Sequence, residues 1–149
     1  MRAVIQRVSR AAVTVDQIRV GAIEQGLVIL LGIHRDDQQT DLEWLVEKII
    51  HLRVFADEQG KMNRSLLDTG GAMLIISQFT LYGDCRQGRR PGYAAAARPE
   101  QAEALYEEFI KAVQQQGIRT ATGRFQAAMA VELVNDGPGT LVVDFAKTF

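Results

Sequence analysis

Residues 27–33 read LVILLGI, a continuous apolar run in the first third of the chain. An apolar run of this length, closed by a glycine and followed by polar residues, is typical of a central strand that is buried on both faces. Residues 72–76 (AMLII) form a second apolar run, which leads directly to Ser77. We therefore expect a sheet whose middle strands lie inside the molecule.

Shorter strand patterns surround these two runs. They occupy residues 3–8, 13–16, 19–23, 53–55, 65–68, 118–121, 129–134 and 140–145. Turn residues at 16–17, 57–60 and 135–139 are expected to join neighbouring strands. Because strands dominate without a regular alternation of strand and helix, the pattern favours an α+β fold with a mostly antiparallel or mixed sheet.

Two long helices complete the expected elements. The first follows Thr40, which forms a capping-box pattern with Glu43, and its apolar residues repeat at helical spacing up to residue 52. The second begins at Pro99 and ends before Gly117, the usual placement of proline and glycine at helix ends. No linker or internal repeat divides the chain, so we expect a single domain over residues 1–149.

The composition is that of a globular protein, with 149 residues, of which 47% are hydrophobic and 23% charged. No apolar run approaches the ~18 residues of a membrane span, and the first residues do not resemble a signal peptide. Cys85 is the only cysteine, so no intrachain disulfide can form. These features predict a cytoplasmic protein.

Positive charge is concentrated in one stretch, although the net charge is -1. Residues 84–98 contain four arginines, Arg86, Arg89, Arg90 and Arg98, against one acidic residue. A glycine-containing loop with guanidinium groups suits contact with phosphate, because the arginine fork matches phosphate oxygens. A solvated basic loop without a ligand explains the same pattern.

The usual catalytic motifs are missing from the sequence. Ser77 is not in a G-x-S-x-G nucleophile elbow, and nothing in the sequence pairs Cys85 with His34 or His51 as a base. Two separated histidines and one cysteine give no metal-ligand spacing. No phosphate-binding or dinucleotide-binding glycine motif is present. We therefore expect neither a metal nor a cofactor.

Two polar segments remain as candidate sites. Residues 77–80 (SQFT) follow a buried strand, where a rigid support can present polar groups. Residues 135–140 (NDGPGT) contain a Gly-Pro bond, which is able to adopt the cis form and to aim two carbonyl oxygens in one direction. Each segment has a simpler interpretation, the first as a polar turn and the second as a hairpin connection.

Several separated motifs in the right order resemble the D-aminoacyl-tRNA deacylase family along essentially the whole chain. The matching stretches are residues 4–11 (VIQRVSRA), 26–32 (GLVILLG), 61–65 (KMNRS), 77–83 (SQFTLYG), 89–91 (RRP) and 135–138 (NDGP). The chain departs from the family's usual pattern at Gln126, where glycine is usual, and at Gly139, where valine is commoner.

The resemblance implies a barrel-like sheet and a homodimer with active sites at the subunit interface. The pocket of one subunit would contain Ser77, Gln78, Phe79 and Thr80. Gly137 and Pro138 of the other subunit would enter that pocket. It further implies that Arg7 braces the Gly-Pro segment. It also implies that Arg86, Arg89 and Arg90 of the arginine loop contact tRNA.

The implied activity is hydrolysis of the ester between a D-amino acid or glycine and the terminal adenosine of tRNA, while L-aminoacyl-tRNA is spared. Main-chain N–H groups near Phe79 and Thr80 would stabilise the oxyanion, and the terminal ribose 2′-hydroxyl would assist. Thr80 as a nucleophile is the alternative mechanism. A non-catalytic RNA-binding module and a cysteine or serine hydrolase of small esters are the alternative functions.

Overall fold

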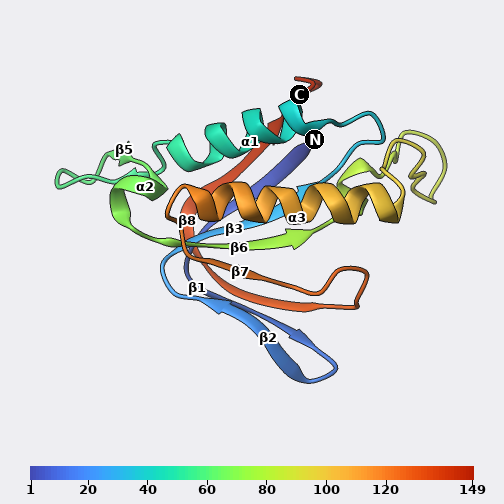
Figure 1. The fold of residues 1–149 in the computed structure, drawn as a ribbon. Coiled ribbons are helices and arrows are strands. Elements are labelled where there is room, and N and C mark those ends of the chain that lie inside the picture. Colours follow the sequence, from blue (N-terminus) through green and yellow to red (C-terminus); the bar gives the residue numbers. More distant parts are fainter.

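Two long helices cover one face of a strongly bent mixed sheet in the computed structural model, which describes residues 1–149 (Figure 1). The sheet consists of β1 (Arg2–Val15), β2 (Ile18–Ile23), β3 (Gly26–Gly32), β6 (Ala72–Ser77), β7 (Thr120–Thr122) and β8 (Ala130–Asp144). The remaining elements are α1 (Gln39–His51), α2 (Leu66–Thr69), α3 (Pro99–Gln115), the 3-10 turn η1 (Phe79–Tyr82), and a small hairpin of β4 (Phe55–Ala56) and β5 (Met62–Arg64). The predicted α+β class with a mixed sheet is confirmed.

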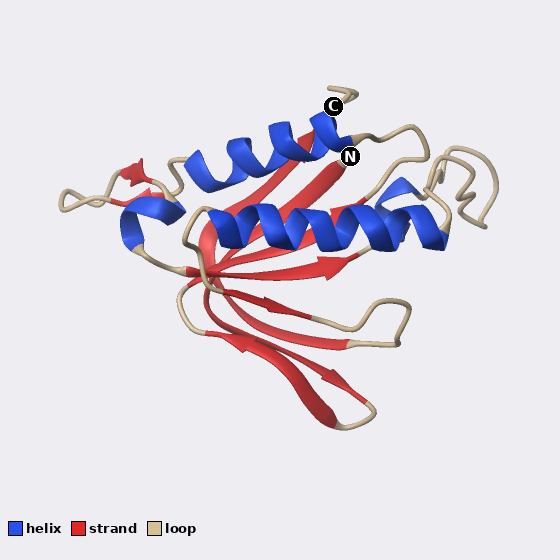
Figure 2. Cartoon of the chain, viewed as in Figure 1, coloured by secondary structure: helices blue, strands red, loops and turns tan.

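Strand β1 organises the sheet because it pairs along both of its edges. Its first half is antiparallel to β3 and its second half to β2, while β8 follows the opposite edge from end to end. Beyond β3, the strands β6 and β7 are added in parallel. Figure 2 shows how these strands converge on one side, where the sheet folds over.

The fold brings β7 back against β2 and nearly closes a barrel. A Cβ atom on Gly21 would lie 2.4 Å from the carbonyl oxygen of Thr122, so only glycine permits this approach. The turn that leads into β2 also has backbone angles that favour a tight hairpin, since Asp16 and Gln17 both have positive φ (49° and 66°). The predicted turn at residues 16–17 is therefore confirmed.

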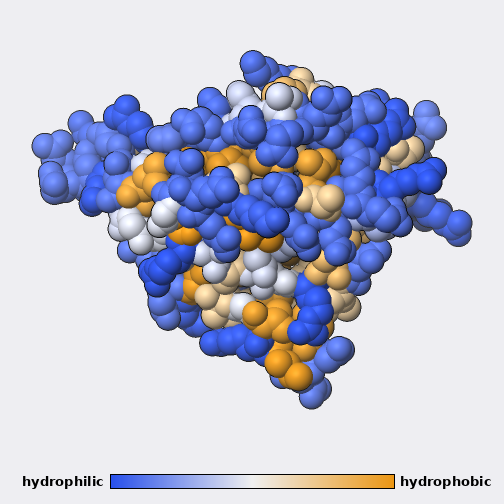
Figure 3. Space-filling model, viewed as in Figure 1, coloured by the Kyte–Doolittle hydropathy of each residue, from blue (hydrophilic) through white to orange (hydrophobic).

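Side chains of the central strands alternate between two cores. Leu27, Ile29 and Ile75 pack under the helices, whereas Val28 and Leu74 point into the barrel. This confirms the prediction that residues 27–33 form a central strand buried on both faces, and the predicted strand at residues 72–76 is buried in the same way. In Figure 3, the apolar surface of this view is limited to a band between the helices and a patch on the barrel below. No helix has the length and apolarity needed to cross a membrane.

Four local predictions were wrong. The expected strands 3–8 and 13–16 are one strand, β1. The expected strand at residues 65–68 is the short helix α2, whose N-cap Ser65 accepts a hydrogen bond from the Asp68 N–H. The first helix begins at Gln39 and its N-cap is Gln38, so Thr40 is not the cap. The Asp41 carboxylate accepts a hydrogen bond from the Gln38 N–H. The expected strands 129–134 and 140–145 are one strand, β8, and the segment between them is a bulge rather than a hairpin turn, since both halves pair with β1 in the same direction.

Close packing at Gly26 gives a direct test of the β3–β6 contact. A Cβ atom on Gly26 would lie 1.9 Å from the Ala72 carbonyl oxygen, whereas a Cβ atom on Gly92 would meet nothing within 4 Å. We expect Gly26→Ala to lower the free energy of unfolding by about 2–3 kcal/mol. This corresponds to a Tm lower by roughly 5–10 °C. Gly92→Ala, the matched control, should leave the Tm unchanged; equal Tm values for both variants would contradict the packing.

Candidate functional site

A pocket of about 700 Å³ opens at the carboxyl end of β6. Residues 77–79 form one wall, the start of α3 with Arg98 and Pro99 forms a second, and residues 125–127 and Met129 form a third. Most of the lining is apolar, and no carboxylate, imidazole or thiol belongs to it. The pocket can therefore enclose an organic group, but its lining supplies no general base.

The turn η1 directly follows the strand that ends in this pocket. The Gln78 N–H donates to the Leu31 carbonyl oxygen at 2.8 Å, which keeps the chain attached to the end of β3. The Leu81 N–H then donates to the Gln78 carbonyl oxygen at 3.2 Å. Because a helical turn leaves its first N–H groups without acceptors inside the turn, Phe79 and Thr80 present free backbone donors.

The side chains of residues 77–80 contribute unequally. Ser77, Gln78 and Phe79 line the pocket, whereas Thr80 is exposed and lies outside the lining. The Gln78 Nε2 donates to Thr80 Oγ1 at 2.6 Å. The Thr80 hydroxyl oxygen is thus bound to an amide donor rather than to a base.

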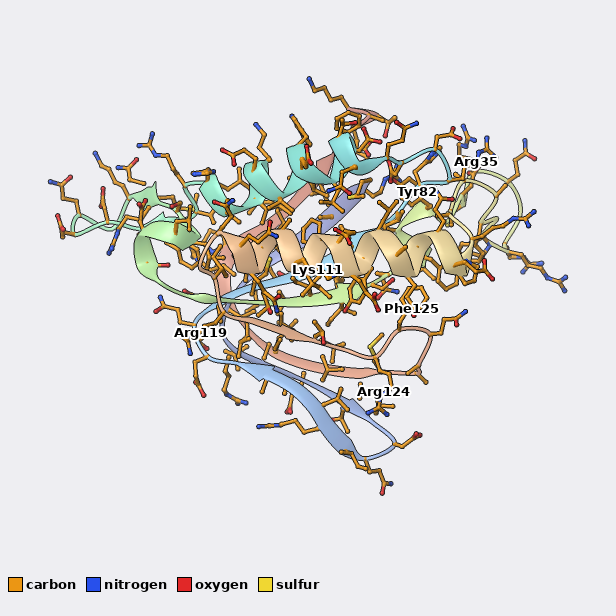
Figure 4. The ribbon with its side chains drawn as sticks, in the orientation of Figure 1. Arg35, Tyr82, Lys111, Arg119, Arg124 and Phe125 are labelled. Atoms are coloured by element: carbon orange, nitrogen blue, oxygen red, sulfur yellow. The ribbon has the colours of Figure 1, made fainter.

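Aromatic residues that the sequence analysis did not single out shape the pocket. Tyr93 packs edge-on against Phe79 with 5.1 Å between ring centroids. Phe125 lies under α3, 6.0 Å from the ring of Tyr106, while Arg124 lies away from that helix (Figure 4). Burial raises the pKa of Tyr106 to about 12, and its hydroxyl donates to the Ile75 carbonyl oxygen at 2.7 Å. The only sequence signal for Tyr93 was an aromatic residue inside the arginine loop.

Gln126 adopts a left-handed backbone conformation in the pocket wall, with φ of 62°. For a residue with a side chain this conformation costs about 1–2 kcal/mol relative to the right-handed region. Glycine, which is usual at this position in the family that the sequence resembles, adopts this conformation without that cost. The departure at Gln126 thus introduces backbone strain next to the site.

Gly137 and Pro138 form an exposed bulge in β8, joined by a cis peptide bond. Buried Arg7 lies beneath the bulge, where its Nε donates to the Asp136 carbonyl oxygen at 3.0 Å and its Nη2 to the Gly137 carbonyl oxygen at 3.3 Å. Its Nη1 donates to the Val54 carbonyl oxygen. The Gly137 oxygen keeps a second lone pair for another donor.

Gly139 is the other departure from the family's usual pattern, and it is buried against Arg7. A Cβ atom at this position would lie 2.5 Å from the Arg7 Cβ and 2.8 Å from the Asp136 carbonyl oxygen. Glycine therefore allows the bulge to lie directly on the arginine. With this backbone, a valine at residue 139 would require the loop to move.

One chain does not bring the two candidate segments together. Ser77 on β6 is in register with Leu31 on β3 and with Ala3 on β1. The bulge on β8 lies opposite Arg7, which is four residues beyond Ala3 on β1, and β8 is three strands away from β6. These offsets correspond to about 13 Å along the strands and about 14 Å across them, or roughly 20 Å in total. In Figure 1, β6 points away from the side on which the sheet folds over.

The arginine loop is closed by paired backbone hydrogen bonds between Asp84 and Gly92. Arg86 is bound to Asp84 through two side-chain hydrogen bonds of 2.8 and 2.7 Å. These bonds lower the pKa of Asp84 to about 2, so the pair persists at neutral pH. Arg89 and Arg90 are exposed and form no salt bridge, which leaves both guanidinium groups open to a ligand.

The structure does not support the cysteine-hydrolase alternative. Cys85 is exposed and has no histidine partner. The Nδ1 atom of His34 accepts a hydrogen bond from the Asp36 N–H, and the His51 ring contacts the Glu47 carbonyl oxygen. No group of three or more His, Cys, Asp or Glu side chains is placed to hold a metal ion.

The fold and pocket define a class of small α+β proteins with a nearly closed mixed sheet and a mostly apolar pocket at the end of one of its strands. Comparison with known proteins identifies the family. The model of the D-Tyr-tRNA(Tyr) deacylase family matches residues 4–144. Proteins named D-aminoacyl-tRNA deacylase from Clostridioides difficile and Desulforudis audaxviator are 55% and 58% identical over 149 residues, the full length of each chain.

Two solved structures share the fold of this chain. A protein named c-Myc DNA Unwinding Element Binding Protein matches with a TM-score of 0.91 and 41% identity, and the match covers 97% of this chain and 98% of that one. A probable eukaryotic D-amino acid tRNA deacylase shares the fold with a TM-score of 0.79, at 20% identity and 95% and 97% coverage. The chain belongs to the D-Tyr-tRNA(Tyr) deacylase family.

Proposed function

We propose that this chain is a chiral proofreading hydrolase. It is a D-aminoacyl-tRNA deacylase. In our proposal it releases free D-amino acid or glycine from tRNA and spares L-aminoacyl-tRNA. The observation that carries the function is the family match over residues 4–144, together with full-length relatives that bear the deacylase name. The apolar pocket at the end of β6 has the size to enclose the aminoacyl end of such a substrate.

In this proposal the active site is completed by a second copy of the chain. The bulge at Gly137 and Pro138 is exposed and too far from the pocket of its own chain to enter it. The outer edge of β8 pairs with no strand, and it bears exposed apolar side chains such as Val142, which is 59% exposed. A two-fold dimer would cover this surface and insert each bulge into the partner's pocket.

Chiral selection would then follow from backbone geometry. The carbonyl oxygens of the Gly137-Pro138 segment would accept hydrogen bonds from the substrate's α-ammonium group, and the ester carbonyl would be held by the partner's pocket. With both groups fixed, a D side chain points to solvent and an L side chain meets the protein wall. Rejection by a clash can exclude the wrong enantiomer more strongly than a lost contact would. Glycine, which has no side chain, would be accepted.

The catalytic step in this proposal relies on the backbone and on the substrate. Water would attack the ester carbonyl, and the N–H groups of Phe79 and Thr80 would stabilise the oxyanion that forms. The bond to the ribose oxygen would then break, which releases the amino acid and leaves the ribose hydroxyl on the tRNA. The 2′-hydroxyl of the terminal ribose would assist the reaction. Two observations support this account: the pocket lining has no general base, and the Thr80 hydroxyl is bound to Gln78.

The remainder of the tRNA would lie along the arginine loop. Arg89 and Arg90 are the better placed contacts for phosphate, because Arg86 is already bound to Asp84. Arg86 could still contact tRNA through an N–H group that its partner leaves free. The bound phosphates would make affinity fall as the salt concentration rises.

Release of tyrosine from D-tyrosyl-tRNA and L-tyrosyl-tRNA tests the proposed function. At micromolar enzyme we expect rapid release from the D form and release at the background rate from the L form. A Cys85→Ser variant should match the wild type, because Cys85 has no base beside it. Absence of D-specific release would contradict the proposed function. If the protein then still bound tRNA, the alternative of a non-catalytic RNA-binding module would apply.

The role of Thr80 is tested by its substitution. We expect Thr80→Ala to keep the deacylation rate within about tenfold of the wild type, because removal of a hydroxyl leaves the oxyanion donors in place. Gln78 loses one partner but remains in the wall. If Thr80→Ala is folded, with unchanged Tm, and its rate falls to the uncatalysed level, Thr80 is the nucleophile and the substrate-assisted mechanism is wrong.

A further inference from the structure

Arg2, the first residue of β1, contacts the turn that carries the proposed oxyanion donors. Its Nη1 donates to the Leu81 carbonyl oxygen at 3.0 Å. Its guanidinium carbon lies 4.1 Å from the centre of the Tyr82 ring, within the range of a cation–π contact. Figure 4 labels Tyr82 on the helix-covered side of the sheet. One side chain thus contacts both of the last two residues of η1.

The carboxyl-terminal segment fixes Arg2 from the other side. Arg2 Nη2 donates to Thr148 Oγ1 at 3.3 Å, and the Phe149 ring centre lies 5.1 Å from the guanidinium carbon. Asp144, whose side chain is fully buried, lies 3.5 Å from Arg2 Nε and accepts hydrogen bonds from the Thr148 N–H and hydroxyl. The last strand and the tail together therefore hold the arginine in one place.

The ion pair between Arg2 and Asp144 has a geometry that contributes little to stability. The Arg2 Nε and one carboxylate oxygen of Asp144 are buried and have no hydrogen-bond partner. Burial of charges costs free energy that only good pairing offsets, so an apolar pair of similar size would stabilise the fold at least as well. Arg2 does form a hydrogen bond with the Leu81 carbonyl oxygen and a cation–π contact with Tyr82, whereas its Nε forms no hydrogen bond with Asp144.

The position of Arg2 complements the polarity of η1. A helical turn has unpaired N–H groups at its start and unpaired carbonyl groups at its end, and a cation favours the carbonyl end. Arg2 occupies that end, while Phe79 and Thr80 present their N–H groups at the other. Gly32 allows the turn to lie closely on β3, since a Cβ atom there would be 3.0 Å from the Leu81 Cβ. The turn is thus held between β3 and Arg2.

We propose that Arg2 is a positioning residue for deacylation: through the Leu81 carbonyl and the Tyr82 ring it fixes η1 so that the Phe79 and Thr80 N–H groups meet the oxyanion. This inference rests on the proposed function. Because the oxyanion develops during the reaction and is absent from the bound substrate, loss of this positioning lowers the rate of the chemical step and leaves substrate binding unchanged.

The single-turnover rate constant for D-tyrosyl-tRNA at saturating enzyme, well below the Tm, tests the proposal. Arg2→Met keeps the apolar stem and removes the charge and donors; it should lower the rate about tenfold and change the apparent Kd less than twofold. Arg2→Lys retains a cation near Tyr82 and should stay within threefold of the wild type. Arg53→Met is the matched control, because Arg53 also donates to a backbone carbonyl, that of Asn63, in the distant β4–β5 hairpin.

Hydrogen exchange gives a second measurement that does not depend on activity. The Leu81 and Gly83 N–H groups donate within and just after η1, so their exchange should be at least tenfold faster in Arg2→Met and unchanged in Arg53→Met. An unchanged rate constant in Arg2→Met beside an active wild type, or unchanged exchange at both amides, overturns the role of Arg2. A wild type without D-specific release overturns the proposed function instead, and the exchange measurement then still decides whether Arg2 holds the turn.

Discussion

The pairing of β1 with β8 determines where the two candidate segments lie in the fold. Since β8 follows β1 from end to end, the bulge of β8 has a fixed place opposite Arg7. The ladders from β1 through β3 to β6 fix Ser77 four residues along and three strands away. A rigid sheet cannot shorten this separation, so the two segments act together only if a second chain supplies one of them. The packed cores on both faces of β3 make the sheet rigid.

Function in this account comes mainly from backbone groups. The start of η1, beside the pocket, offers N–H donors, and the pocket lining offers no general base. The bulge offers carbonyl oxygens that Arg7 supports from beneath. Backbone N–H and carbonyl groups are the same in nearly all residues, so an active site of this kind depends on the side chains that fix the position of its backbone. In this account two arginines of β1 have this supporting role: Arg7, near the middle of the strand, lies below the bulge, and Arg2, its first residue, lies behind η1.

The sequence predicted the elements whose patterns are long and uniform. The apolar runs of β3 and β6 and the helix between Pro99 and Gly117 are confirmed. The sequence misassigned residues 65–68 because a single capped turn is too short to show helical periodicity. It divided β8 because a Gly-Pro-Gly segment is typical of turns, and only pairing with β1 shows that the strand continues. Tyr93, Phe125 and Arg2 were missed because their roles arise from contacts between segments far apart in the chain.

Mixing two inactive variants tests most directly whether the site is shared between subunits. Gly137→Glu should fold, because a Cβ atom there meets only the Asn135 side chain at 3.5 Å, but the glutamate would block entry of the bulge. Ala127→Trp should fill the pocket. After subunit exchange in a 1:1 mixture, half of the dimers are mixed and each has one intact site, so about a quarter of the wild-type activity should return. A mixture that remains inactive although mixed dimers have formed would show that each chain builds its site alone, and would contradict the account.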